Sequence, residues 1–150
     1  MPKWNPYLQF YSDTVRSLPS AYNRCWDHAM GDDMREKMFE SVDMEKALSF
    51  AWAIPDERAL SIVANYAPIV EVGAGLGYWA RCLQERGVKV SAYDIMVGGE
   101  QDRTEVEAKA ADEAAVEPHY WTEVKHGGPE LLQQEEHKSA TLLLCYPDDF

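Results

Sequence analysis

The sequence predicts an α/β fold in which a mostly parallel sheet lies between layers of helices. Short apolar runs predict four buried strands, at about residues 69–73, 88–94, 121–125 and 140–146. Segments with helical spacing separate most of these runs, and strands that alternate with helices form βαβ units with right-handed crossovers. The length of 150 residues suffices for a single domain with a real core.

Helices are predicted before the first strand. Apolar side chains recur at three- and four-residue steps over residues 7–18, and again over residues 34–48. A further helix is predicted after Pro55, because Asp56 falls in its first turn, where the helix dipole favours a carboxylate. We therefore divide the single domain into an N-terminal helical region, residues 1–67, and a sheet-forming half.

The sheet-forming half, residues 68–150, contains one segment of different character. Residues 96–117 are acidic and Ala-rich, which predicts a solvated loop with a short exposed helix. The segment that begins at Pro129 predicts a short helix, and the apolar run that follows it is the fourth predicted strand.

Charge and cysteine content restrict the partners and the compartment. The net charge of -12 disfavours nucleic acid and anionic membranes as partners, because both carry negative phosphate groups. No apolar run approaches the ~20 residues that cross a bilayer, and no basic segment followed by an apolar one marks a secretory leader. Three cysteines without a C-x-x-C pair suit a reducing compartment, so we expect a cytoplasmic protein. The histidines have no metal-ligand spacing, so we predict no metal.

A glycine-rich turn carries the functional signal. The first strand runs into Gly73, Gly75 and Gly77, and the next strand ends at Asp94. Glycine lets the backbone approach a ligand closely, and a helix that follows such a turn offers unpaired N–H groups. A carboxylate at the end of the neighbouring strand can accept hydrogen bonds from both hydroxyls of a ribose. The sequence therefore predicts a cofactor that contains a nucleoside.

The glycine spacing separates the possible cofactors. The dinucleotide fingerprint G-x-G-x-x-G would place its third glycine at Tyr78, and no G-K-[ST] follows as in a P-loop. Glu71 also disfavours a pyrophosphate, because a carboxylate close to a phosphate repels it. An NAD(P)-dependent oxidoreductase is accordingly the least favoured alternative.

The residues E-V-G-A-G-L-G at 71–77 resemble motif I of the class I S-adenosylmethionine-dependent methyltransferases, written E/D-x-G-x-G-x-G. S-A-Y-D, which ends at Asp94, resembles the acidic end of their second strand. The blocks FAWAIP, EVGAGLGYWA, YWTEV, GGP and LLLCYP resemble, in this order, a little-characterised methyltransferase-like subgroup over roughly residues 50–150. The resemblance implies a Rossmann-like three-layer fold in which strands three, two, one and four lie in that order within a seven-stranded sheet.

The resemblance also implies roles for single residues. The glycine turn would lie under the methionine and ribose parts of S-adenosylmethionine, with Asp94 on the ribose and Ile95 beside the adenine. Glu71 would orient the turn or reach the amino group of the cofactor through water. In this family N-terminal helices often form a lid over the cofactor, and the FAWAIP block next to the first strand fits such a lid by resemblance. The implied cofactor-binding residues are Glu71, Gly73, Ala74, Gly75, Gly77, Asp94, Ile95, His126 and Gly127.

The sequence does not identify the catalytic residues or the methyl acceptor. Methyl transfer needs mainly alignment and exclusion of water, with a base only where the acceptor loses a proton. The candidate catalytic residues are Tyr146, Asp148 and His126, and Asp149 adjoins them. Y-P-D-D-F at 146–150 differs from the Pro-Pro-aromatic or Asn-Pro-Pro-Tyr of the family, which disfavours an amino-group acceptor. We expect methyl transfer to a small-molecule or protein acceptor, and the alternative is a non-catalytic binding module on a degenerate methyltransferase fold.

The sheet is predicted to be incomplete. The fifth strand and the closing hairpin of the family have no counterpart after residue 146. The fourth strand would then have an uncovered apolar edge, which promotes aggregation. We favour a shortened form of a longer protein, with a homodimer through the strand-four edge as the main alternative and cover by the N-terminal helices as another. For Trp52 and Trp79 the sequence leaves two interpretations: packing in the core, or lining a cofactor pocket.

Overall fold

The computed structural model describes residues 4–18, 30–97 and 119–145. It contains a four-stranded, all-parallel sheet with the strand order β3-β2-β1-β4. The central strands are β1 (Ile69–Val72) and β2 (Val90–Asp94), and the edge strands are β3 (Val124–His126) and β4 (Thr141–Leu143). The mixed α/β fold with a parallel sheet is confirmed, and each strand overlaps a predicted run.

The third strand begins later than predicted, at Val124. The reason is that Trp121, in the predicted strand, makes its hydrogen bonds elsewhere. Its backbone N–H donates to the Leu76 carbonyl at 2.9 Å, and its indole N–H donates to the Ser49 carbonyl at 2.8 Å. The chain therefore joins the sheet only after these contacts have been made.

The helices follow the predicted order. The N-terminal region contains α1 (Pro6–Ser17), α2 (Asp32–Glu40), α3 (Met44–Leu48) and α4 (Glu57–Ala64), and α5 (Tyr78–Gln84) links β1 to β2. Asp56 caps α4 by accepting a 2.7 Å hydrogen bond from the backbone N–H of Ala59. The helix predicted after Pro129 is instead a pair of 3-10 turns, η2 (Pro129–Gln133) and η3 (Glu135–His137).

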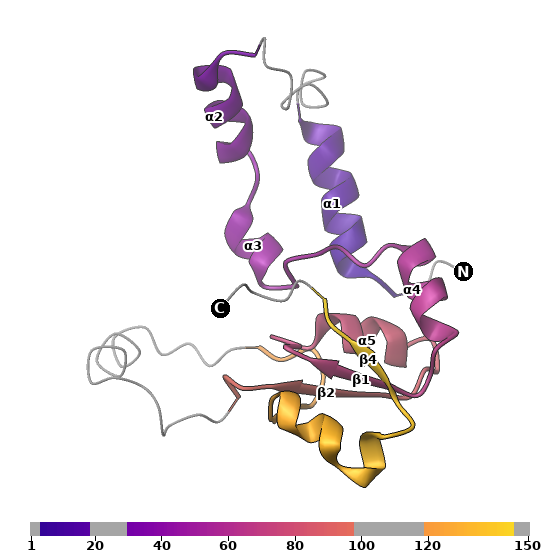
Figure 1. Cartoon of the computed structure of the whole chain (residues 1–150). Coiled ribbons are helices and arrows are strands. Elements are labelled where there is room, and N and C mark those ends of the chain that lie inside the picture. The colour runs from indigo at the N-terminus through magenta and orange to yellow at the C-terminus, as the bar shows by residue number, and fades with distance from the viewer. Residues whose placement is uncertain (1–3, 19–29, 98–118, 146–150) are drawn as a thin grey trace, which may run out of the picture.

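The helices form layers on the two faces of the sheet. Figure 1 shows α5 on one face and the turns η2 and η3 on the other, with α1, α2 and α3 extending away on the α5 side. None of the described helices combines the length and the apolar character needed to cross a bilayer.

A buried aromatic cluster joins the helical region to the sheet. Tyr78, the residue that breaks the dinucleotide fingerprint, is 1% exposed at the start of α5. Its hydroxyl accepts a 2.8 Å hydrogen bond from the backbone N–H of Tyr7 and donates to Asn5 Oδ1 at 2.9 Å. The rings of Phe50 and Trp121 pack against it at centroid distances of 5.2 and 5.1 Å. This cluster fixes the N-terminal region over the α5 face.

The outer edge of β4 is open among the described residues. No described strand pairs with it, and Leu142 and Leu144 are 41% and 52% exposed. Tyr146 and residues 147–150 lie outside the described residues.

Candidate functional site

The turn between β1 and α5 is built on three glycines with left-handed backbone. Gly73, Gly75 and Gly77 have φ angles of 74°, 54° and 76°. L-amino acids with side chains rarely adopt these angles, so the alternating pattern in the sequence reflects a backbone requirement at all three positions.

The three glycines have different surroundings. A Cβ atom on Gly73 or Gly75 would meet nothing within 4 Å, whereas a Cβ on Gly77 would lie 2.7 Å from Val124 Cγ2. Gly77 therefore allows close packing of the start of α5 against β3. Gly73 and Gly75 leave open space above the backbone, where a ligand has access.

Asp94 holds the turn against the end of β2. Its Oδ2 accepts a 2.7 Å hydrogen bond from the Gly75 N–H, and its Oδ1 accepts a 2.8 Å bond from the Met96 N–H. An ionised carboxylate has about four lone-pair directions, so two further donors can still be accepted. The pairing of turn and acidic residue that the sequence predicted is thus a direct contact.

Glu71 lies beneath the turn and is 2% exposed. Its Oε2 has no hydrogen-bond partner. Burial raises the pKa of Glu71 to about 8; a backbone hydrogen bond from Ala80 opposes this rise, and the nearby Asp94 adds to it. The carboxyl is therefore mostly protonated at neutral pH, and a cation close to it would favour the ionised form.

These residues line a cavity of about 450 Å³, within the usual range of about 300–1,000 Å³ for small-molecule sites. It lies at the carboxyl ends of β1, β2 and β4. Its walls come from residues 48, 50–53, 71–76, 79, 94–96, 128–129 and 144–145. The lining is mainly apolar, with two carboxyl groups and no basic side chain among the described residues.

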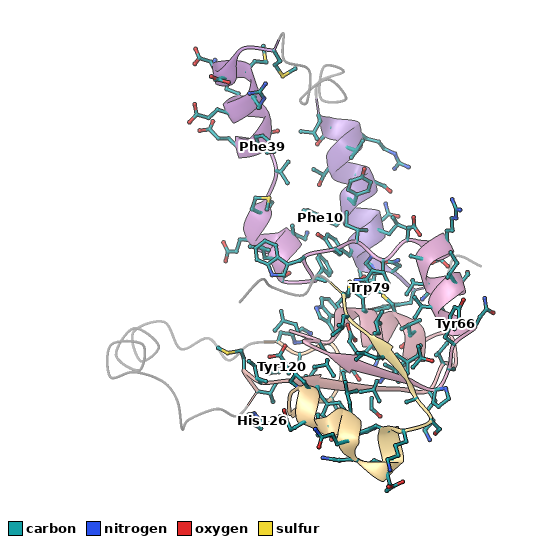
Figure 2. All side chains as sticks on the ribbon, in the orientation of Figure 1. Phe10, Phe39, Tyr66, Trp79, Tyr120 and His126 are labelled. Atoms are coloured by element: carbon teal, nitrogen blue, oxygen red, sulfur yellow. The ribbon has the colours of Figure 1, made fainter. Side chains whose placement is uncertain are left out.

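The cavity brings together most of the predicted binding residues but not all of them. Those that line it are Glu71, Gly73, Ala74, Gly75, Asp94 and Ile95. Gly77 packs behind the turn, and Gly127 lies against Leu131. His126 is exposed at the end of β3, where its Nδ1 lies 2.9 Å from the Val97 carbonyl. Figure 2 shows His126 near η2 and Trp79 on the α5 side of the sheet.

Gly128 and Pro129, which follow the third strand, line the cavity, whereas the predicted binding residues His126 and Gly127 do not. The family resemblance implied a role for this turn as a whole and did not separate its residues. Leu144 and Cys145, at the end of β4, were not among the predicted binding residues although they line the cavity. Their position directly after a parallel strand was the available signal.

Ionisable groups are few in this cavity. Among the described lining residues they are Glu71, Asp94 and Cys145. Burial raises the pKa of the Cys145 thiol to about 11, with a further contribution from Glu71, so the thiol stays neutral at pH 7. The catalytic candidates Tyr146 and Asp148, with Asp149, lie outside the described residues. No group of three or more His, Cys, Asp or Glu side chains in the described ranges is arranged to hold a metal ion.

Comparisons of the chain with models of protein families, with curated proteins and with solved structures found no match.

Proposed function

We propose that the chain binds S-adenosylmethionine in this cavity and transfers its methyl group to a small-molecule or protein acceptor. The observation that carries the proposal is the contact between Gly75 and Asp94, which sets an open glycine backbone beside a carboxylate at one cavity end. A Rossmann-like methyltransferase fold, in which such a turn faces the cofactor, is the finer fold class that we propose with it.

The chemistry of the cavity fits this cofactor in three respects. Asp94 retains lone pairs for the two hydroxyls of a ribose. The Glu71 carboxyl lines the cavity with its Oε2 unpaired, and a cation held close to it would favour its ionised form. The space above Gly73 and Gly75 admits a ligand against the backbone. By contrast, the lack of basic lining residues among those described disfavours a dinucleotide pyrophosphate, because no cation would offset its charge.

Bound S-adenosylmethionine would supply a methyl group already activated on a sulfonium. The chain then needs to hold the reacting groups in line and to exclude water. Apolar side chains such as Leu76 and Trp79 in the wall serve the exclusion of water, and the glycine turn serves the positioning. None of the three ionisable lining groups is well suited as a general base: Cys145 is neutral, Asp94 already accepts two backbone hydrogen bonds, and Glu71 is 2% exposed and mostly protonated at neutral pH.

A binding module without turnover is the second candidate. It is favoured by the absence of a well-suited base among the described cavity residues. The two candidates agree on cofactor binding and differ in turnover, so a methyl-transfer assay with a panel of acceptors separates them.

Calorimetric titration with S-adenosylhomocysteine tests the proposal. We expect saturable one-site binding that Gly75→Ala weakens by at least about tenfold, because the added methyl group enters the ligand space. Gly87→Ala is the matched control: Gly87 also has a positive φ, 77°, and open space at the Cβ position, but it does not line the cavity. Both variants should lose a similar ~1–2 kcal/mol of stability.

Equal binding by the two variants would contradict the proposed site. Failure of the folded wild-type chain to bind S-adenosylhomocysteine at all would reject the proposed cofactor.

A further inference from the structure

The helix α2 (Asp32–Glu40) stands apart from the sheet. Figure 1 shows it at the far end of the helical region, with α3 between it and the sheet. None of its residues whose burial the structure describes is buried, and none of its described residues lines the cavity. Helices shorter than about 12–15 residues are marginal in water and owe most of their stability to the packing of one face. A partner that packs on α2, a helix of 9 residues, would therefore stabilise it.

The two sides of α2 differ in character. With about 3.6 residues per turn, Met34 and Phe39 fall on one half of the helix. The acidic residues Asp33, Glu36 and Glu40 fall on the other half. Both apolar side chains reach solvent, because Met34 is 51% exposed and Phe39 is 47% exposed. α2 is therefore an amphipathic helix whose apolar half remains open to solvent.

The exposed apolar side chains continue into α3. Met44, the first residue of this helix, is 50% exposed. Ala47 of the same helix is buried in the main core cluster, so α3 is held on the packed body of the molecule. We call Met34, Phe39 and Met44 the α2–α3 surface. Large apolar side chains exposed on successive turns indicate a binding surface, and methionine adapts its shape readily to a partner.

The charges around the α2–α3 surface determine which partner fits it. Residues 32–46 contain six acidic and three basic side chains. Arg35 is paired with Asp32 at 2.8 Å. The Lys46 ammonium lies over the Phe10 ring, 5.0 Å from its centroid. The exposed acidic side chains of the segment include Asp33, Glu36, Glu40 and Glu45. A basic partner therefore gains electrostatic attraction along the edge of the apolar surface.

Two other occupants fit these charges less well. A second copy of this chain would bring its own acidic residues against those of the first, because a two-fold contact places the same surface on both sides. An anionic membrane would be repelled by the acidic flank and by the formal net charge of -12. A basic segment of a different protein complements both the apolar and the acidic parts of the surface.

We propose that the α2–α3 surface is a docking site for a basic amphipathic helix of a partner protein. The apolar side chains of that helix would pack on Met34, Phe39 and Met44, and its lysine or arginine side chains would lie toward the acidic flank. Because the surface lies outside the cavity, such docking does not depend on the proposed function.

Three peptides of about 14 residues, or about four helical turns, test the charge and the pattern of the partner. The first has leucine at helical spacing and lysine elsewhere, the second replaces lysine by glutamate, and the third shuffles the leucines of the first. We expect fluorescence anisotropy with the full chain to show saturable binding of the first, at least about tenfold tighter than that of either other peptide. Equal binding of the shuffled peptide would reveal charge attraction alone and overturn the proposal, as would a lack of saturable binding of the first.

Substitutions on α2 locate the bound peptide. Phe39→Ser and Met34→Ser should each weaken binding of the first peptide by about fivefold or more, because each removes apolar contact area. Tyr66→Ser is the matched control, since Tyr66 is a 59% exposed aromatic beside α4, away from Phe39 (Figure 2). Glu40→Lys should also weaken binding, whereas Glu123→Lys, at an exposed site beside β3, should not. Wild-type affinity in both serine variants of α2 would place the peptide elsewhere and reject the docking site.

Two further measurements with Phe39→Ser separate the other occupants. In sedimentation velocity the variant should associate with itself as the wild type does, and loss of association would assign the surface to a second copy. With vesicles of phosphatidylcholine and phosphatidylserine the wild-type chain should not co-sediment. Co-sedimentation that Phe39→Ser abolishes would assign the surface to a membrane. Either of these results would overturn docking of a basic helix.

Discussion

At the scale of single residues, Glu71 combines burial with an unpaired oxygen. Burial raises the pKa of Glu71 from 4.5 to about 8. Between these two pH values the carboxyl is therefore protonated in the folded chain and ionised in the unfolded chain. Rising pH therefore favours unfolding in this window. The stability that Glu71 contributes is therefore fully present below about pH 4.5 and is lost by about pH 8.

We expect Glu71→Gln to remove this dependence, because glutamine does not ionise. The free energy of unfolding of the wild type should fall relative to that of the variant by up to about 1.4 kcal/mol per pH unit across the window. Urea denaturation at pH 5, 6, 7 and 8 measures the difference. Glu123→Gln, a change at an exposed glutamate, should leave the wild-type slope in place. Parallel pH profiles for wild type and Glu71→Gln would contradict the assigned protonation.

The glycine turn shows what residue patterns can predict. Gly73, Gly75 and Asp94 were identified because a tight strand-to-helix turn beside a neighbouring strand end is a local arrangement, set by spacing along the chain. Trp52 was left undecided between core and cavity. Its place depends on indole hydrogen bonds to residues on both sides of it, from partners far along the chain, and no periodicity encodes them.

At the scale of elements, the aromatic cluster joins α1 to α5 through one hydroxyl. The Tyr78 hydroxyl accepts from the Tyr7 N–H and donates to Asn5, which also caps α1. The sequence identified Tyr78 only as a residue that breaks the dinucleotide fingerprint. Its partners lie on a helix more than seventy positions away, so the contact was beyond a reading of local pattern.

Tyr78→Phe should destabilise the fold by about 1–3 kcal/mol, because it leaves the buried Tyr7 N–H without an acceptor. The matched change Tyr11→Phe removes a hydroxyl from a 45% exposed ring of the same helical region and should be nearly neutral. Chemical denaturation of both variants gives the comparison. A Tyr78→Phe variant as stable as the wild type would show that the hydroxyl does not fasten α1 to α5.

The alternation of strands and helices predicted the parallel sheet and the helix placement, and the family resemblance implied the strand order β3-β2-β1-β4, whereas neither predicted where the elements end. β3 begins after Trp121 because that residue bonds to the glycine turn and to the N-terminal region. The segment after Pro129 forms 3-10 turns where a helix was predicted. Contacts that are distant in sequence set the start of β3. The segment after Pro129 is short, and it forms 3-10 turns instead of a longer helix.

At the scale of the whole molecule, the open edge of β4 suggests an association between copies. Leu142 is 41% exposed on a strand that has no outer neighbour among the described residues. Sheet edges of this kind pair readily with other chains. We expect concentration-dependent self-association in sedimentation velocity at moderate salt.

Leu142→Lys should reduce this association, because a charged side chain on an edge strand opposes pairing. Ile62→Lys, which places the same charge at a 49% exposed position on α4, is the control and should leave association unchanged. A wild-type chain that stays monomeric over the whole concentration range would contradict an association through this edge.

We propose above all that the glycine turn and Asp94 together bind S-adenosylmethionine or its demethylated product. The most direct measurement follows backbone amide resonances of the labelled chain during titration with S-adenosylhomocysteine. We expect saturable shifts at Gly73, Gly75 and Met96, which line the cavity beside Asp94, and no shifts at Gly31 and Gly87. Saturable shifts confined to other residues, or no shifts at millimolar ligand, would contradict it.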